Sequence, residues 1–168
     1  TPFHVSIIGG NISRSVHEFS IHVTLLGSAE RWLSRSGARP GDWVAVTGEL
    51  GLAAAGLEVL KRDEKEGPTK FPELVEAWRR PKPRVKEMLR LLASGAVTSA
   101  IDVSDGLSSE LAHLAEHSHC GFLLDEGRLS IPEQMVNAAT AMKLDERPTT
   151  LQWALSGGED YEVLLTVD

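Results

Sequence analysis

The chain has 168 residues, of which 42% are hydrophobic, and a formal charge of −7 at pH 7. This is enough apolar material for one folded core with room for part of a second unit. The negative charge excludes a nucleic-acid backbone as the main partner, because such binding needs clustered lysine and arginine. No apolar run approaches the roughly 20 residues that cross a bilayer, and the start lacks signal-peptide character. We therefore expect a cytoplasmic protein without a membrane partner.

In chain order, the first predicted elements are two strands. Val5 and Ile7 alternate with polar neighbours, and the residues from Phe19 to Leu25 alternate in the same way. The loop between them contains Gly9-Gly10-Asn11. Paired glycines allow a backbone to approach a ligand closely, but Gly and Asn are also ordinary turn formers, so both interpretations stay open.

A turn at residues 37–42 predicts a domain boundary, with residues 1–36 ending one domain and residues 37–168 forming another. An apolar strand over 43–46 and a helix over 52–60 follow, and the charged run 61–70 is predicted to be a surface loop.

A helix is predicted after the prolines at 81 and 83. Its apolar residues Val85, Met88, Leu89 and Leu92 share one face, which we expect to lie in the core.

The strongest chemical candidate is the turn after the predicted strand 100–103. Asp102, Ser104 and Asp105 stand where this strand ends and the next helix begins. A helix N-terminus favours phosphate oxygens, and two carboxylates suit the magnesium that accompanies a nucleotide. The alternative is that Ser104 or Asp105 only caps the helix, and spacing alone favours it.

The last predicted elements are a strand over 121–124, helices over 132–142 and 149–154, and a strand over 161–167. Before the final strand, a tight glycine turn displays Glu159 and Asp160, and either acid could bind a substrate cation. A solvent-facing turn is the alternative, which the turn alone favours. The mixture of strands and helices predicts an α+β (α/β layered) fold.

Four segments taken together resemble thiamine-monophosphate kinases, and the stretch Arg80-Pro-Lys-Pro-Arg84 lies between the second and third. They are Gly9-Gly10-Asn11-Ile12-Ser13-Arg14-Ser15, Arg35-Ser36-Gly37-Ala38-Arg39-Pro40-Gly41-Asp42, Ala100-Ile101-Asp102-Val103-Ser104-Asp105-Gly106-Leu107 and Ala154-Leu155-Ser156-Gly157-Gly158-Glu159-Asp160-Tyr161-Glu162. Each motif is modest alone, but their shared order makes the match specific over nearly the whole chain.

The resemblance implies a two-domain enzyme of the aminoimidazole-ribonucleotide-synthetase superfamily. Such an enzyme forms a homodimer through its N-terminal domains and binds ATP with several Mg²⁺ ions. It transfers the γ-phosphoryl group of ATP directly to thiamine monophosphate and so makes thiamine diphosphate. Residues 1–36 would then be the remnant of the N-terminal nucleotide-binding and dimerisation domain, and 37–168 most of the C-terminal domain. We expect a fragment that lacks the beginning of the enzyme and its last stretch.

The resemblance also implies roles for individual residues, none of which is a catalytic acid or base. The ATP-binding positions are Gly10, Asn11, Arg35 and Ser104; the metal-binding positions are Asn11, Asp102 and Asp105; the substrate-binding position is Glu159. Where this chain has Asn11 the family pattern usually has Asp, and the neutral amide weakens one magnesium site.

Two alternatives remain. One is another ATP-using member of the superfamily, similar to selenophosphate synthetase or to a hydrogenase-maturation enzyme. The other is a catalytically inactive nucleotide-binding or dimerisation fragment, which Asn11 favours.

Overall fold

The protein divides into two units, Thr1–Trp32 and Leu33–Asp168. Its structure, a computed structural model, describes residue 3 and residues 5–168. Residues 1, 2 and 4 of the first predicted domain therefore lie outside the described residues. The assignment of 1–36 and 37–168 to the two domains of a larger enzyme stays a prediction.

The described residues of the first unit form neither a helix nor a strand, so the two strands expected there are wrong. Their apolar side chains lie in solvent; Ile7 is 94% exposed and Phe19 90% exposed. A strand needs a neighbour for its backbone hydrogen bonds, and an isolated pair of strands is marginally stable at best. The alternating pattern identified residues suited to a sheet, but not the sheet that they would join.

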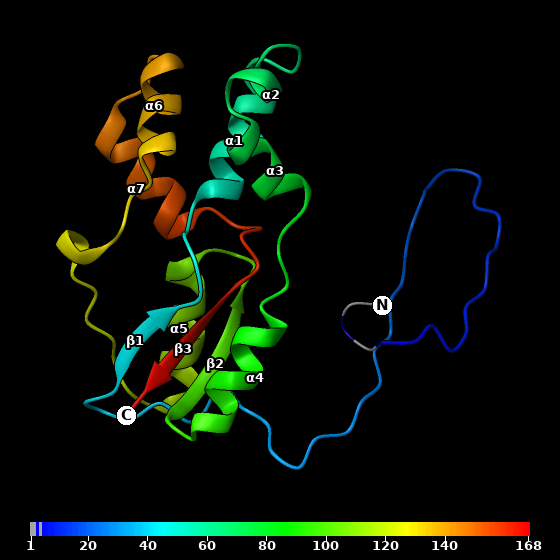
Figure 1. Ribbon diagram of the computed structural model, residues 1–168, viewed down its shortest axis with the longest axis vertical. Coiled ribbons are helices and arrows are strands. Elements are labelled where there is room, and N and C mark those ends of the chain that lie inside the picture. The colour runs from blue at the N-terminus through cyan, green and yellow to red at the C-terminus, as the bar shows by residue number, and fades with distance from the viewer. Residues whose placement is uncertain (1–2, 4) are drawn as a thin grey trace. The chain divides into compact units, whose positions relative to one another are not determined.

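The second unit is built on a three-stranded antiparallel sheet (Figure 1). The strands are β1 (Trp43–Val46), β2 (Val97–Val103) and β3 (Glu162–Val167), in the order β1-β3-β2. Val46 and Ile101 both pair with Leu164, so the last strand in sequence lies in the middle. All three strands were predicted, two of them with boundaries that differ by one to three residues.

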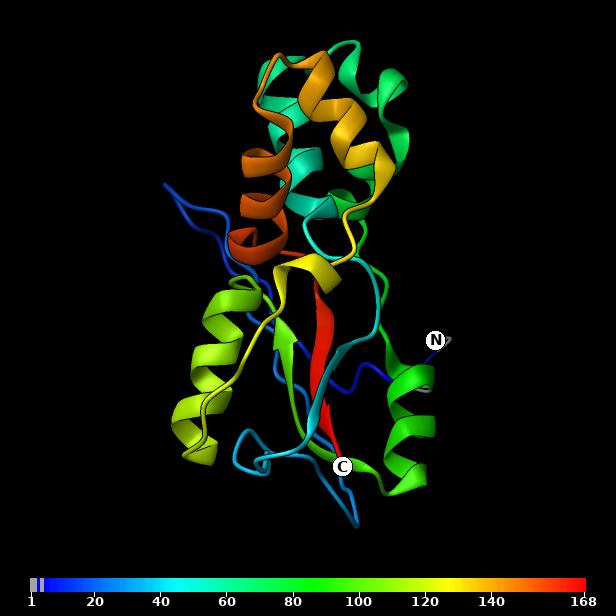
Figure 2. The ribbon, with the colours of Figure 1, turned by 90° about the vertical axis from the view of Figure 1, so that its left-hand side faces the viewer.

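Helices lie on both sides of this sheet and beyond one end of it, and this mixture confirms the predicted α+β class. They are α1 (Leu52–Arg62), α2 (Gly67–Lys70), α3 (Pro72–Arg79), α4 (Val85–Ser94), α5 (Leu107–Ser118), α6 (Glu133–Ala141) and α7 (Glu146–Ser156), with a 3-10 turn at Glu126–Arg128. Figure 2 shows α4 and α5 on opposite sides of the sheet. The remaining five helices gather beyond one end of it (Figure 1). Among the described residues, every helix is too short or too polar to cross a membrane.

One hydrophobic core connects the sheet with the helical group. Val103 and Leu164 from the sheet, Leu114 from α5, Leu74 from α3 and Met135 from α6 are all fully buried. The two turns that carry the predicted chemistry leave this core directly, one between β2 and α5 and the other between α7 and β3. Their backbones are therefore anchored on both sides.

Three local predictions are wrong. The helix α4 forms as expected, but it has no buried residue, and Leu89 is 62% exposed. An amphipathic pattern reveals an apolar face, not what covers that face. The expected strand at 121–124 is an irregular segment with Leu123 96% exposed, and no strand of the described residues pairs with it. The predicted loop at 61–70 includes the end of α1 and the short α2.

Candidate functional site

The acidic turn between β2 and α5 presents two carboxylates to solvent. Asp102 lies one residue before the end of β2, Asp105 lies two residues before α5, and both are exposed. In the described part of the chain, neither carboxylate is engaged by an ion pair or a side-chain hydrogen bond. Both carboxylates are therefore available to bind a cation that prefers oxygen ligands, such as magnesium.

The capping alternative for this turn is wrong. The N-cap residue of α5 is Gly106, and no side chain caps the helix. Instead Glu110, only 3% exposed, accepts a hydrogen bond from the Asp105 backbone N–H at 3.2 Å and a longer one from the Ser104 hydroxyl at 3.4 Å. A buried carboxylate thus holds the turn from beneath, while the two aspartates stay available.

Sequence reasoning missed Glu110, although a signal was present. Leu107, Glu110 and Leu114 are the buried residues of α5, at positions i, i+3 and i+7. A carboxylate on the apolar face of a helix needs a buried partner, because burying an unpaired charge is costly. Its place on that face could have identified it as a support for the turn.

The turn between α7 and β3 lies directly against the acidic turn. The Glu159 N–H donates to the Ser104 carbonyl at 2.8 Å, and the Tyr161 N–H donates to the Val103 carbonyl at 2.9 Å. A Cβ on Gly158 would stand 2.6 Å from the Ser104 carbonyl oxygen, so only glycine fits there. Two motifs that are some fifty residues apart in sequence thus form one site, which joins the predicted Asp102, Ser104 and Asp105 with Glu159.

The Glu159 carboxylate is exposed and accepts one hydrogen bond. Its Oε2 lies 2.8 Å from Nε1 of Trp78 on α3. The Glu159 backbone has φ of 68°, in the left-handed region that a non-glycine residue seldom adopts. Such a conformation persists only where surrounding contacts fix it, as the hydrogen bond to Ser104 does here.

The neighbouring acid, Asp160, has a structural role. It is 8% exposed and accepts hydrogen bonds from the N–H groups of Gly51 at 2.7 Å and Ala53 at 3.1 Å. These are donors at the start of α1 that the helix itself cannot satisfy, so Asp160 caps α1 from a distance. Burial, partly offset by these hydrogen bonds, raises the pKa of Asp160 from 3.8 to about 6.

Because of Asp160, the free energy of unfolding is expected to fall as the pH rises from about 4 to about 6 and its carboxyl group loses its proton. Because its pKa is higher in the folded than in the unfolded state, the folded state binds more protons across this window. Denaturant unfolding of the wild type and Asp160→Asn at several pH values measures the effect. The wild-type free energy of unfolding minus that of the variant should fall across the window. A difference that does not change with pH would contradict this assignment.

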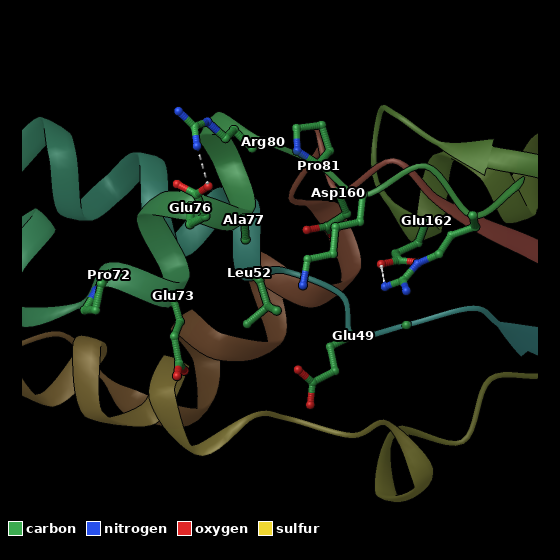
Figure 3. A pocket seen from close by; sticks show the side chains of 13 residues that line it. Glu49, Leu52, Pro72, Glu73, Glu76, Ala77, Arg80, Pro81, Asp160 and Glu162 are labelled. Carbon is green, nitrogen blue, oxygen red and sulfur yellow. Dashed lines mark hydrogen bonds and ion pairs between the residues drawn. The ribbon is translucent and has the colours of Figure 1, made fainter. Parts of the chain in front are cut away.

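A cavity of about 620 Å³ is lined by residues of α1, α3 and the start of β3 (Figure 3). The ion pair of Arg84 with Glu162 forms part of its wall, with Arg84 Nε 2.7 Å from Glu162 Oε2. The Thr47 hydroxyl donates to the same oxygen at 2.6 Å. The hydrogen bonds to Glu162 raise the pKa of the Arg84 guanidinium. The other lining residues are Gly48, Glu49, Leu52, Pro72, Glu73, Glu76, Ala77, Arg80, Pro81, Lys82 and Asp160.

Among the other predicted site residues, Arg35 belongs to the second unit and lies away from the acidic turn. The Arg35 carbonyl accepts from the Ser118 hydroxyl at the far end of α5. A twelve-residue helix is about 18 Å long, so the Arg35 backbone is remote from Asp105. Gly10 and Asn11 are exposed residues of the first unit. The roles of these three residues stay predictions.

The described side chains of the site do not supply enough ligands to hold a metal ion without further ligands. Within the described ranges, no three His, Cys, Asp or Glu side chains are grouped to hold a metal ion. Asp102 and Asp105 supply carboxylate oxygens, which suit Mg²⁺, and this ion commonly takes its remaining ligands from water and substrate phosphates. The residues present therefore fit a magnesium ion that arrives with a nucleotide.

Comparisons with known proteins agree with the motifs. The family model described as AIR synthase related protein, C-terminal domain, matches residues 39–165. The chain is 39% identical to the thiamine-monophosphate kinase of Salmonella typhimurium over 168 residues, which is 98% of this chain and 49% of that protein. It is 33% identical to the enzyme of the same name from Aquifex aeolicus over 164 residues, which is 98% of this chain and 51% of that protein. The resemblance inferred from the motifs is confirmed, and the chain spans about half the length of these curated relatives.

A solved structure also matches the fold. AaThiL complexed with AMPPCP and TMP superimposes with a TM-score of 0.73 at 30% identity, covering 82% of this chain and 43% of that chain. The arrangement of sheet and helices described above is therefore also found in that structure.

Proposed function

This chain belongs to the AIR synthase related proteins, and on that premise we propose that it takes part in phosphorylating thiamine monophosphate. The reaction uses ATP and Mg²⁺ and yields thiamine diphosphate. The names of the relatives and the ligands AMPPCP and TMP in the matching structure support this choice over other members of the superfamily.

One observation carries the proposal: the acidic turn and the glycine turn form a single site. The backbone hydrogen bond from Glu159 to Ser104 holds the glycine turn against the turn that carries Asp102 and Asp105, and this supports a shared role for the three acids. Phosphoryl transfer depends mainly on positioning and on neutralising phosphate charge. Asp102 and Asp105 as magnesium ligands, with Glu159 as the substrate-binding residue, would meet that requirement.

Asp102 and Asp105 would hold the magnesium ion. When bound, Mg²⁺ neutralises phosphate charge and helps to orient the transferred group. The first turn of α5 contributes backbone N–H groups that no side chain caps, and these attract phosphate oxygens. Glu110 keeps the turn in place through the Asp105 N–H.

The transfer itself needs no covalent intermediate on the protein. A phosphate oxygen of thiamine monophosphate forms a bond to the γ-phosphorus of ATP, and the bond from that phosphorus to the bridging oxygen of ADP breaks. The attacking oxygen is already deprotonated near neutral pH, so the site requires no strong general base. Glu159 would bind the cationic thiamine part and orient the acceptor phosphate.

Further parts of this proposal concern the rest of the enzyme. Gly10, Asn11, Arg35 and Ser104 would contact the nucleotide, and Asn11 would also serve as a weak magnesium ligand. The exposed apolar residues of the first unit support pairing with a partner, as in a homodimer. A cytoplasmic location follows from the proposed role in cofactor synthesis.

The proposed function is tested by incubating the protein with thiamine monophosphate, ATP and Mg²⁺. Chromatography then measures the thiamine diphosphate that forms. Calorimetry should in parallel measure the binding of AMPPCP and of thiamine monophosphate. We expect turnover that stops when EDTA removes the metal.

The outcomes separate the alternatives. Binding of both ligands without turnover would favour an inactive binding module. Nucleotide binding without affinity for thiamine monophosphate would favour another superfamily activity, and binding of neither ligand would overturn the proposal.

A further inference from the structure

Trp78 is a half-buried residue for which the motifs suggested no role, yet it makes a contact in the candidate site. Its indole N–H donates to Glu159 across 81 positions of sequence, at 2.8 Å. The other carboxylate oxygen of Glu159 has no partner within the described chain, and the side chain is exposed. One oxygen is therefore held while the other faces solvent.

The helix that carries Trp78 is held in place by a tight helix crossing. A Cβ on Gly56 of α1 would stand 2.0 Å from the Leu74 carbonyl oxygen of α3, so the two helices touch through their backbones. Leu74 is fully buried, and Trp78 follows it by four residues, on the same face of α3. The crossing thus fixes where the Trp78 ring can reach.

Glu159 is fixed independently on the other side of the contact. Its N–H bonds to Ser104, its φ is positive, and Gly158 packs against the same carbonyl. The backbones that carry Trp78 and Glu159 are therefore both fixed by contacts of their own. A hydrogen bond between side chains on two fixed backbones favours one orientation of the charged acceptor.

The chemistry of the donor matters as much as its position. An indole N–H donates a hydrogen bond but carries no charge. An arginine or lysine at this position would hold Glu159 equally well, but its positive charge would offset the negative charge of the carboxylate. Trp78 orients the acid and leaves its charge available to a cationic ligand.

We propose that Trp78 is a positioning residue that holds the Glu159 carboxylate ready for an organic cation. The ligand class is an aromatic cation with an N–H donor, and the proposal rests on the proposed function, in which that ligand is the thiamine part of the substrate. The indole N–H donates to Glu159, the proposed substrate-binding residue, so Trp78 should affect binding of that substrate and not of the nucleotide.

The test compares two replacements by calorimetry, with thiamine monophosphate and with AMPPCP in the presence of Mg²⁺. Trp78→Phe keeps an aromatic ring but loses the donor, and should weaken binding of thiamine monophosphate about 10-fold. Trp78→His keeps a ring N–H and should recover most of that loss. Affinity for AMPPCP should stay within about twofold in both variants. Trp43→Phe, on the edge strand β1 with Trp43 66% exposed, is the matched control.

A double-mutant cycle distinguishes loss of the hydrogen bond to Glu159 from loss of packing around Trp78. In a Glu159→Gln background, Trp78→Phe should cost much less than it does in the wild type, since the charged acceptor is already gone. Equal costs in both backgrounds, or equal loss of both ligands, would overturn the positioning role. Wild-type protein that does not bind thiamine monophosphate would overturn the proposed function, and this inference with it. Wild-type binding that Trp78→Phe leaves unchanged would overturn the inference alone.

Discussion

Replacing Asp105 with asparagine is expected to lower magnesium-dependent turnover at least about 100-fold, while leaving the fold nearly unchanged. The carboxylate is exposed and has no hydrogen-bond partner in the described chain, so its removal costs little stability. The loss should fall on binding of the metal–nucleotide complex, because asparagine presents a neutral oxygen to the cation. Titration of AMPPCP with and without Mg²⁺, beside thermal unfolding, measures both quantities.

Asp145→Asn is the matched control for this variant. Asp145 is also exposed, also stands just before a helix, and makes no side-chain capping hydrogen bond there. It should change neither nucleotide affinity nor turnover. A large loss of stability in Asp105→Asn with unchanged nucleotide affinity would refute the metal-binding role and assign Asp105 a structural one.

Replacing Glu162 with alanine is expected to lower the free energy of unfolding by about 3–5 kcal/mol. Glu162 is 7% exposed and accepts hydrogen bonds from Arg84 and Thr47. Its removal leaves a guanidinium, with only 24% of its side chain exposed, without its main counter-charge. In β3 Glu162 pairs with Val103, directly beneath the acidic turn, so the site should lose rigidity as well.

Glu126→Ala provides the comparison for this effect. This substitution breaks the ion pair between Glu126 and Arg147, in which the Arg147 side chain is 62% exposed and the Glu126 side chain 59% exposed. It should lower the free energy of unfolding by less than about 1 kcal/mol. Urea unfolding of both variants gives the two values. Similar costs for Glu162→Ala and Glu126→Ala would show that the pair in the cavity wall is no stronger than a surface contact.

Much of the second unit could be predicted from local patterns. The strand at Trp43–Val46 and the helix that begins near Leu52 follow from apolar composition. The helices that begin near Val85 and Leu107 follow from apolar periodicity, since each repeat shows which residues share a face. The same patterns failed where a partner was needed. The stripe on α4 and the alternating residues near Phe19 are apolar, but periodicity does not reveal what lies against them.

The sequence by itself determined which residues are candidates for the site: Asp102, Ser104 and Asp105 after a strand, and Glu159 in a glycine turn, in the order shared by a family of kinases. Only the tertiary structure decided how they act together. It placed Glu159 against Ser104, gave Glu159 the Trp78 donor, and joined the Asp160 carboxylate to the start of α1. The physical reason is that these contacts join residues some fifty to more than a hundred positions apart. Their geometry depends on how the helices and the sheet pack, which no short stretch of sequence encodes.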